Sequence, residues 1–378
     1  MNHDLDELDF DIPGIPLPES DEYPDPSSLN ENSDPYIVAR SHDCEVVKLI
    51  AGATKLVYKI LRREPYKSPT AASVRSLVRF LWQFQVIDID TLLMGRRVNP
   101  YLDLLLKARD LIADGISADA ICPLTGSLAE GLRLQIDAVV ARMRQRAASP
   151  EWQVRIETIL RRCRDNHQSL TTYVESLYRC RSTKLLVLRI DFGYAADHAT
   201  MMSRPFTISE EQAKADFEQL IRHVREHYDF LGYARRLEYG VFSGIHFHAM
   251  IFLNGHEAWH EGRIAHLLGE VWRDRITKGQ GRSYNCNRQF YRHRGIGLVG
   301  YQDVQRRHYL LEYAGRYLTK AEFWVEGERS GKAFVRGLMP EEPSGVGRPR
   351  ADDFGRCTAG RWKSSLKKTL GRVGTQAP

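Results

Sequence analysis

In the stretch Gly244–Ile251 (GIHFHAMI), two histidines alternate with apolar residues, a pattern that predicts a β-strand. Side chains of a β-strand point alternately to the two faces of a sheet. His246, His248 and Met250 therefore share one face, and the residues between them share the other. We expect the apolar face to pack onto a core and the two imidazoles to lie side by side on the exposed face. Neighbouring neutral imidazoles form half of a metal site.

A glutamate on the preceding predicted strand, residues 232–239, can complete this site. Gly240 and Gly244 bracket a three-residue connection, which suits a short hairpin loop. Such a hairpin places Glu238 opposite His246 on the same face, within reach across the strands. A divalent cation held by these three side chains keeps open coordination positions and can polarise a substrate oxygen. The alternative is a pair of half-exposed histidines beside an unrelated glutamate.

A helix is predicted over residues 303–323, which contain no proline. Tyr313 and Tyr317 are four residues apart and should stack on one helix face, with Lys320 on nearly the same face. A phenol becomes an effective nucleophile when a cation stabilises the phenolate, and both a lysine one turn away and a nearby metal ion meet that need. The alternative is that these tyrosines, together with Tyr309, are packing residues.

A glutamate, a His-hydrophobe-His strand and a later helical Tyr-x-x-x-Tyr-x-x-Lys resemble, in that order, the motifs of the HUH endonucleases, which start rolling-circle replication. Residues 184–336 resemble more closely the replication initiators of filamentous phages (the inovirus gene II protein type) and their prophage-encoded relatives. Conjugative relaxases carry their tyrosine before the histidine cluster. The order in this chain therefore favours the replication initiators.

This resemblance implies a metal-dependent, site-specific nickase and strand transferase, which cuts single-stranded or origin DNA of a phage or mobile element through a 5′-phosphotyrosine intermediate. The further partners that it implies are a host replication helicase or polymerase. The roles that it implies are Glu238, His246 and His248 as ligands of Mg²⁺ or Mn²⁺, Tyr317 as the primary nucleophile, Tyr313 as the second nucleophile and Lys320 as the stabilising cation.

Two other interpretations stay open. The same two histidines and carboxylate could serve a mononuclear iron or cupin-like enzyme. A cupin should be nearly all β and should place a glutamate a few residues after the histidines, whereas residues 249–253 contain none. The other interpretation is a non-catalytic prophage DNA-binding protein whose metal site has been lost.

The net charge of +6 conceals an asymmetry. The first 36 residues contain 11 Asp or Glu and no Lys or Arg, so that the remainder carries a net charge of +17. A body this basic favours a polyanionic partner, and nucleic acid is the first candidate, although the charge could serve solubility alone. The six cysteines are scattered without close pairs and no segment has the length of a membrane span, which favours a reducing cytoplasm.

Four regions are predicted from the pattern along the chain. Residues 1–42 form a disordered acidic tail, residues 43–181 a helical domain or extension, residues 182–336 the endonuclease domain and residues 337–378 a flexible basic tail. The helices expected in the second region span residues 45–62, 71–85, 101–113, 127–146 and 150–178.

From Lys184 the predicted elements follow the order β-α-β-β-α-β-α, which is the split βαβ or ferredoxin-like order. The fold class is therefore α+β, with an antiparallel sheet and helices packed on one side of it. The other side should stay open for metal and nucleic acid. The predicted elements are strands 185–192, 232–239, 244–251 and 296–301, with helices 209–228, 257–276 and 303–323.

Residues 282–294 interleave arginines with aromatic residues, which favours contact with phosphates and stacking on unpaired bases. An exposed loop without a ligand is the alternative. The residues predicted to bind DNA are Arg282, Arg288, Tyr291, Arg292 and Arg294. Four other histidines have the helical spacing of metal ligands but no obvious third ligand, and are interpreted as surface residues: His223, His227, His256 and His260.

Overall fold

The protein is an α+β structure with one six-stranded antiparallel sheet and a separate bundle of helices. The computed structural model describes residues 35–62, 69–86, 97–109, 112, 130–194, 208–240, 244–319, 325–326 and 332–341. Most of the predicted tails, residues 1–34 and 342–378, lie outside the described residues. None of the described helices combines the length and apolar character that crossing a bilayer requires.

The helical region contains a helix at each of the five predicted positions, and only the start of α1 differs from its predicted bound by more than four residues. Helix α1 begins at Pro35, inside the segment predicted as acidic tail, and proline is well suited to the first turn of a helix because its missing N–H would be unpaired there. The bounds are Pro35–Arg62 for α1, Ala71–Val86 for α2, Pro100–Arg109 for α4, Glu130–Ala147 for α5 and Pro150–Cys180 for α6.

A two-residue strand interrupts this helical region and joins it to a distant part of the chain. Strand β1 (Arg97–Val98) pairs with β7 (Val325–Glu326). Strand β7 follows the helical segment Val304–Thr319, which carries Tyr309, Tyr313 and Tyr317 and is called the tyrosine helix below. These two segments belong to different predicted regions, residues 43–181 and 182–336. The chain therefore returns to the helical region before it forms the last strand of the large sheet, β8 (Phe334–Arg336).

The large sheet has the strand order β5-β2-β4-β3-β8, and β6 pairs with the same edge of β2 as β5. All of its pairs are antiparallel, so β2 and β3 run parallel to each other with β4 inserted between them. The strands are β2 (Lys184–Tyr194), β3 (Phe230–Gly240), β4 (Gly244–Asn254), β5 (Gly281–Asn285), β6 (Gly297–Gly300) and β8 (Phe334–Arg336).

Helices cover both faces of the sheet, which corrects the expectation that one face stays open. One face packs on α7 (Glu210–His227), on α8 (Glu261–Glu270) and on the π-helical segment η3 (Val271–Ile276). The other face packs on the second half of α6 and on the tyrosine helix. The physical reason is that β2 and β4 are apolar on both faces over half their length, so both faces must be buried.

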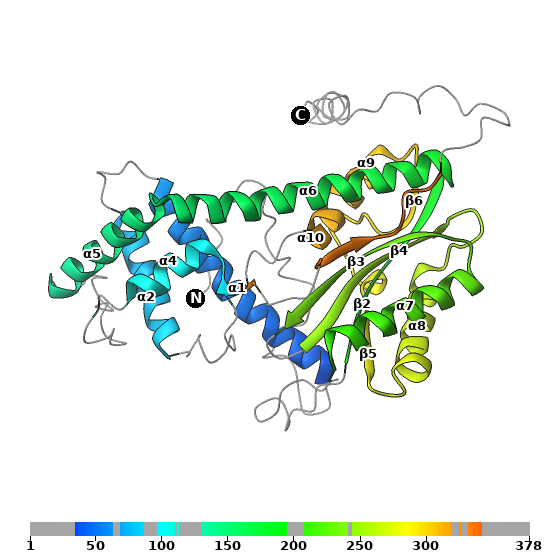
Figure 1. Cartoon of the computed structure of the whole chain (residues 1–378), viewed down its shortest axis with the longest axis horizontal. Helices are drawn as coiled ribbons and strands as arrows, with labels where there is room; N and C mark the ends of the chain where they lie inside the picture. The colour runs from blue at the N-terminus through cyan, green and yellow to red at the C-terminus, as the bar shows by residue number, and fades with distance from the viewer. Residues whose placement is uncertain are drawn as a thin grey trace, which may run out of the picture.

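Helix α6 connects the two parts of the molecule, as Figure 1 shows along the top of the view. Its first half lies in the core of the helical bundle and its second half lies on the sheet. Arg307 of the tyrosine helix donates two hydrogen bonds to the Glu175 carboxylate of α6, at 2.8 and 2.9 Å. Glu312, on the same helix as Arg307, lies 3.5 Å from His167 of α6. These contacts fix the tyrosine helix against α6.

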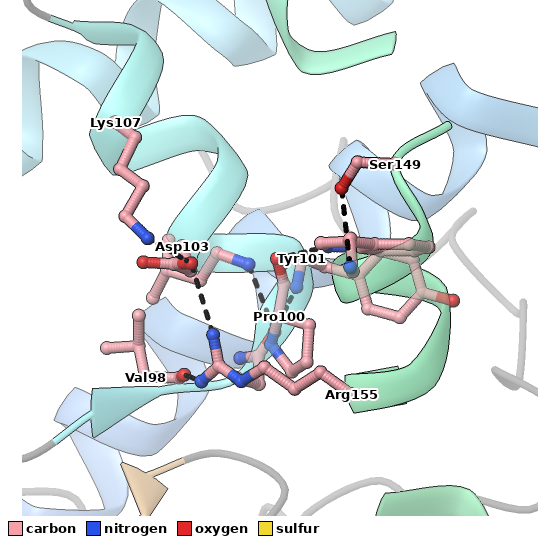
Figure 2. A network of polar contacts seen from close by, with 10 residues as sticks. Val98, Pro100, Tyr101, Asp103, Lys107, Ser149 and Arg155 are labelled. Carbon is pink, nitrogen blue, oxygen red and sulfur yellow. Dashed lines mark hydrogen bonds and ion pairs between the residues drawn. The ribbon is translucent and has the colours of Figure 1, made fainter. Parts of the chain in front are cut away.

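Arg155 anchors the beginning of α6 to the helical bundle, as Figure 2 shows. Its guanidinium donates to Asp103 of α4 at 3.1 Å and to the carbonyl oxygen of Val98 in β1 at 2.6 Å. The hydroxyl of Ser149 accepts from the backbone N–H of Trp152 and caps α6. The start of α6 is thus held by two other elements, α4 and β1, and is capped by Ser149.

We expect Arg155→Ala to lower the free energy of unfolding by about 1–2 kcal/mol, because it removes a partly buried guanidinium and the two hydrogen bonds that this group donates. Arg164→Ala is the matched control on the same helix, since the Arg164–Glu157 pair is 57% and 61% exposed. That control should cost less than about 1 kcal/mol. Urea unfolding of both variants measures the difference, and equal losses would contradict the anchoring role of Arg155.

Candidate metal centre

The register between β3 and β4 brings the three predicted metal ligands together. Glu238 pairs directly with His246, as the predicted hairpin requires, although the loop residues 241–243 lie outside the described chain. Oε2 of Glu238 lies 3.2 Å from Nε2 of His248 and 3.7 Å from Nε2 of His246. The ligand atoms all lie within 4.8 Å of one another, and no other such group occurs among the described residues. This cluster could hold a metal ion.

Each imidazole is oriented by an acceptor behind it. Nδ1 of His248 lies 2.6 Å from a carboxylate oxygen of Asp191, on the neighbouring strand β2. Nδ1 of His246 donates to the carbonyl oxygen of Gly244 at 2.9 Å. A carbonyl can only accept, so the proton of neutral His246 lies on Nδ1 and its Nε2 lone pair points to the cluster. Such acceptors are typical of histidines that bind metals.

A buried arginine holds the carboxylate. Arg236, next but one to Glu238 on β3, places Nε 2.7 Å from Oε1 of Glu238 and is 2% exposed. The other oxygen, Oε2, remains directed at the two imidazoles. One oxygen is thus fixed by the protein and the other is presented to the centre.

Burial and charge together set the protonation of the cluster. Burial alone would raise the pKa of Glu238, but the charges of His248 and Arg236 and the hydrogen bonds to the imidazoles lower it well below 4.5. Burial alone would lower the pKa of His248, but the charges of Asp191 and Glu238 and the hydrogen bonds to them raise it above 6.5. A proton on His248 therefore lies between two carboxylates, and a bound cation would replace it at Nε2.

Tyr317 is the tyrosine that reaches this cluster. Its ring centroid lies 5.2 Å from that of His248, edge to face, and the guanidinium carbon of Arg189 lies 4.2 Å from the Tyr317 ring centroid. Tyr317 is 7% exposed and Arg189 is 3% exposed. Tyr317 therefore lies between a buried cation and a candidate metal ligand.

Tyr313 has different neighbours, because the predicted helix is not continuous. The segment consists of α9 (Val304–Tyr309), the π-helical segment η5 (Leu310–Gly315) and α10 (Arg316–Thr319). Hydrogen bonds to the fifth residue change the angle between residues four apart, so the two tyrosines do not stack as predicted. Tyr313 stacks on His293 with 4.4 Å between ring centroids. Lys320 lies outside the described residues.

His246 and His248 are buried, which corrects the expectation that they lie on an exposed face of the sheet. His246 is 1% exposed and His248 is not exposed at all. The reason is the cover that α6 and the tyrosine helix place over this face of the sheet. Glu238, whose side chain is 22% exposed, is the member of the cluster nearest to solvent.

The predicted DNA-binding segment is only partly a loop. Its beginning forms the edge strand β5, and Arg282 donates to the carbonyl oxygens of Gly279 and Gly281. Arg294 donates to two backbone carbonyls of its own loop and lies 3.4 Å from Glu261, so it fixes the loop. Arg288 and Arg292 are exposed, Tyr291 is half-buried, and the Phe290 side chain is 94% exposed.

The other histidine pairs form no comparable site among the described residues. His227 bonds through Nδ1 to the carbonyl oxygen of His223, one turn earlier on α7. His256 bonds to the hydroxyl of Thr183, and His260 accepts from the indole of Trp259. His198 lies outside the described residues.

Three functional neighbours of the cluster were not identified from the sequence: Asp191, Arg189 and Arg236. Each is a charged residue that faces the same side of the sheet as the histidines, and the residues of β2 around Arg189 and Asp191 are otherwise apolar. That pattern was a usable signal, because buried charges require partners. The partner of Asp191 depends on the pairing of β2 with β4, which no local sequence pattern predicts.

Comparison of the chain with protein-family models, with curated proteins and with solved structures returned no match. The residues and their geometry therefore carry the functional argument.

We expect Asp191→Asn to weaken Mn²⁺ binding by about 10–100-fold, because it removes the carboxylate that orients His248. Titration calorimetry at alkaline pH measures this, since His248 is then already neutral. Asp216→Asn is the matched control, because Asp216 is also buried and hydrogen-bonded but belongs to α7 on the opposite face. Unchanged affinity in Asp191→Asn would contradict the orienting role.

We expect the affinity for Mn²⁺ to rise with pH through a midpoint above 6.5, because the cation must displace the proton that Asp191 and Glu238 hold on His248. The lowered pKa of Glu238 keeps its carboxylate charged throughout that range. In Asp191→Asn the midpoint should move to lower pH, since one of the two stabilising charges is lost. A midpoint that stays in place would contradict this assignment.

Proposed function

We propose that this protein is a metal-dependent single-stranded DNA nickase and strand transferase, which initiates rolling-circle replication of a phage or mobile element. The observation that carries the proposal is the position of Tyr317, whose ring lies 5.2 Å from His248 of the Glu-His-His cluster. A phenol beside a candidate metal centre is the arrangement that tyrosine attack on a phosphate requires.

The arrangement of the sheet supports the same proposal. Helix α7 connects β2 to β3, β4 lies between these two parallel strands, and α8 leads on to the opposite edge. This arrangement agrees with the split βαβ order that we propose for a ferredoxin-like HUH endonuclease. The order of the three motifs along the chain supports it as well.

The residue set fits a divalent cation, because two Nε2 atoms and one carboxylate oxygen converge with their other atoms already bonded. Such a ligand set suits Mn²⁺ better than Mg²⁺, although either can bind. A bound cation would polarise a non-bridging oxygen of the scissile phosphate and so favour attack at phosphorus.

In the proposed reaction the phenolic oxygen of Tyr317 attacks phosphorus and loses its proton. A bond forms between this oxygen and phosphorus, and the bond from phosphorus to the 3′ oxygen breaks. That oxygen takes up a proton and becomes a 3′-hydroxyl, which can prime synthesis. The downstream strand stays attached through a 5′-phosphotyrosine, so the same centre can rejoin ends. The charge of Arg189 beside the Tyr317 ring would stabilise developing negative charge.

We expect Tyr317→Phe to abolish covalent attachment to DNA, by at least about a hundredfold, because it removes the nucleophile and keeps the ring. The substrate is a random-sequence single-stranded pool labelled at the 3′ end, with Mn²⁺. The downstream fragment carries that label, so a denaturation-resistant labelled protein band reports the 5′ linkage. A label at the 5′ end should not transfer to the protein.

Tyr309→Phe, on the same helix, is the matched control and should keep full attachment. Tyr313→Phe should also keep the first cleavage, as a second nucleophile would act only in a later step. If the adduct maps to Tyr313, the assignment of Tyr317 is wrong. If unaltered protein shifts DNA in a gel but forms no adduct, the protein is a non-catalytic DNA-binding protein and the proposed reaction fails.

A further inference from the structure

A small pocket is lined in part by Arg189, whose guanidinium lies over the Tyr317 ring, and the proposed reaction leaves this pocket unexplained. It is lined by Arg189, Tyr291, His293, Gly295 and Tyr313, among others, and has a volume of about 20 Å³. That volume exceeds the roughly 10–15 Å³ that one water-sized group needs, so it accommodates a single oxygen atom or water. A base or a sugar ring would not fit inside.

The polar groups around the pocket are those that favour an anion. They are a guanidinium, an imidazole and two phenols, and none of the residues that line it is acidic. Arg189 is 3% exposed, so its charge acts in a partly dry environment where electrostatic attraction is stronger than in water. Nδ1 of His293 is buried and has no hydrogen-bond partner among the described residues. Such an atom requires a partner, which a ligand oxygen could supply.

Arg189 links this pocket to the candidate metal centre. It lines the pocket and also stacks over the ring of Tyr317, which in turn lies against His248. Tyr313, which also lines the pocket, stacks on His293 with an angle of 25° between the rings and is 37% exposed. A backbone that places one phosphate at Tyr317 could therefore place a neighbouring phosphate at this pocket, beside an accessible aromatic face.

We propose that the pocket binds one non-bridging oxygen of a second phosphate of single-stranded DNA, next to the phosphate that Tyr317 attacks. This inference rests on the proposed function. Arg189 supplies the charge and Nδ1 of His293 supplies a hydrogen bond, while the exposed ring of Tyr313 offers a stacking surface for the attached nucleotide. In this assignment Tyr313 contacts substrate during the first cleavage and does not attack it.

The test measures affinity for DNA without catalysis. Binding of a fluorescent oligodeoxythymidylate to the full chain is followed by polarisation in EDTA, so that no metal contributes, over a range of salt concentrations. Arg189→Met keeps an unbranched stem over the Tyr317 ring and removes the charge. It should weaken binding about tenfold and reduce the slope of log K against log salt by about 0.7, the value for one lost phosphate contact on a single strand.

His293→Phe is the second variant. Because His293 is only half-buried, we expect this variant to fold like the unaltered protein. Phenylalanine keeps the stack on Tyr313 and removes the nitrogen, so binding should weaken about fivefold with an unchanged salt slope. His308→Phe is the matched control, because His308 also contacts the Tyr313 ring, at 5.9 Å, but does not line the pocket. Its affinity for DNA should equal that of the unaltered protein.

Unchanged DNA affinity in both pocket variants would overturn the proposal. A loss of DNA affinity in Arg189→Met without a change in salt slope would also overturn it, because that result indicates a structural role for Arg189.

Inorganic phosphate distinguishes the ligand source. If it raises the melting temperature of the unaltered chain but not of His293→Phe, and DNA affinity is the same for both, the pocket serves free phosphate and the DNA assignment fails. Covalent trapping is a separate measurement. If the unaltered protein forms no adduct but both pocket variants bind DNA more weakly, the proposed reaction is wrong and the pocket assignment stands.

Discussion

The structure depends on one constraint, which is that the charges buried on one face of the sheet must neutralise one another. Asp191, His248, Glu238 and Arg236 form a continuous series of ion pairs and hydrogen bonds across strands β2, β4 and β3. Removing one partner from a buried ionic network typically costs about 3–5 kcal/mol, because the remaining charge is left unpaired. The register of three strands is therefore fixed by charge as well as by apolar packing.

The π-helical segment η5 changes the course of the tyrosine helix where that helix packs on this charged face of the sheet. Gly295 lies so close to η5 that a Cβ atom there would clash with the backbone nitrogen of Leu310. The loop that carries His293 can thus approach the helix directly. The wider turn separates the neighbours of Tyr313 from those of Tyr317. Two residues of the same type, four apart, then lie in different chemical surroundings.

Local sequence patterns predicted much of this molecule, and long-range contacts account for what they missed. The alternation in β4 and the bracketing glycines placed Glu238 opposite His246, and the observed pairing confirms it. The predicted helix over residues 209–228 is observed as α7, and the hydroxyl of Ser209 caps its start by accepting from the backbone N–H of Gln212.

The cover over the histidines could not be predicted in the same way. It requires α6 to lie on the sheet, and that contact joins residues more than a hundred positions apart, such as Tyr178 and Val299. The π-helical turn was also missed, because its hydrogen-bond pattern has no simple signature in residue periodicity. The strand β5 was hidden in a segment whose arginines and aromatic residues suggested a loop.

The sharing of α6 between two hydrophobic cores has a consequence for modularity. A boundary drawn near residue 181 falls at the end of a helix whose second half is part of the sheet's own interior. Strand β7 also returns the chain to β1 in the helical bundle. The two parts are therefore poor candidates for exchange by recombination. A transplanted endonuclease unit would have to carry α6 with it, and a helical bundle left behind would have lost one of its walls.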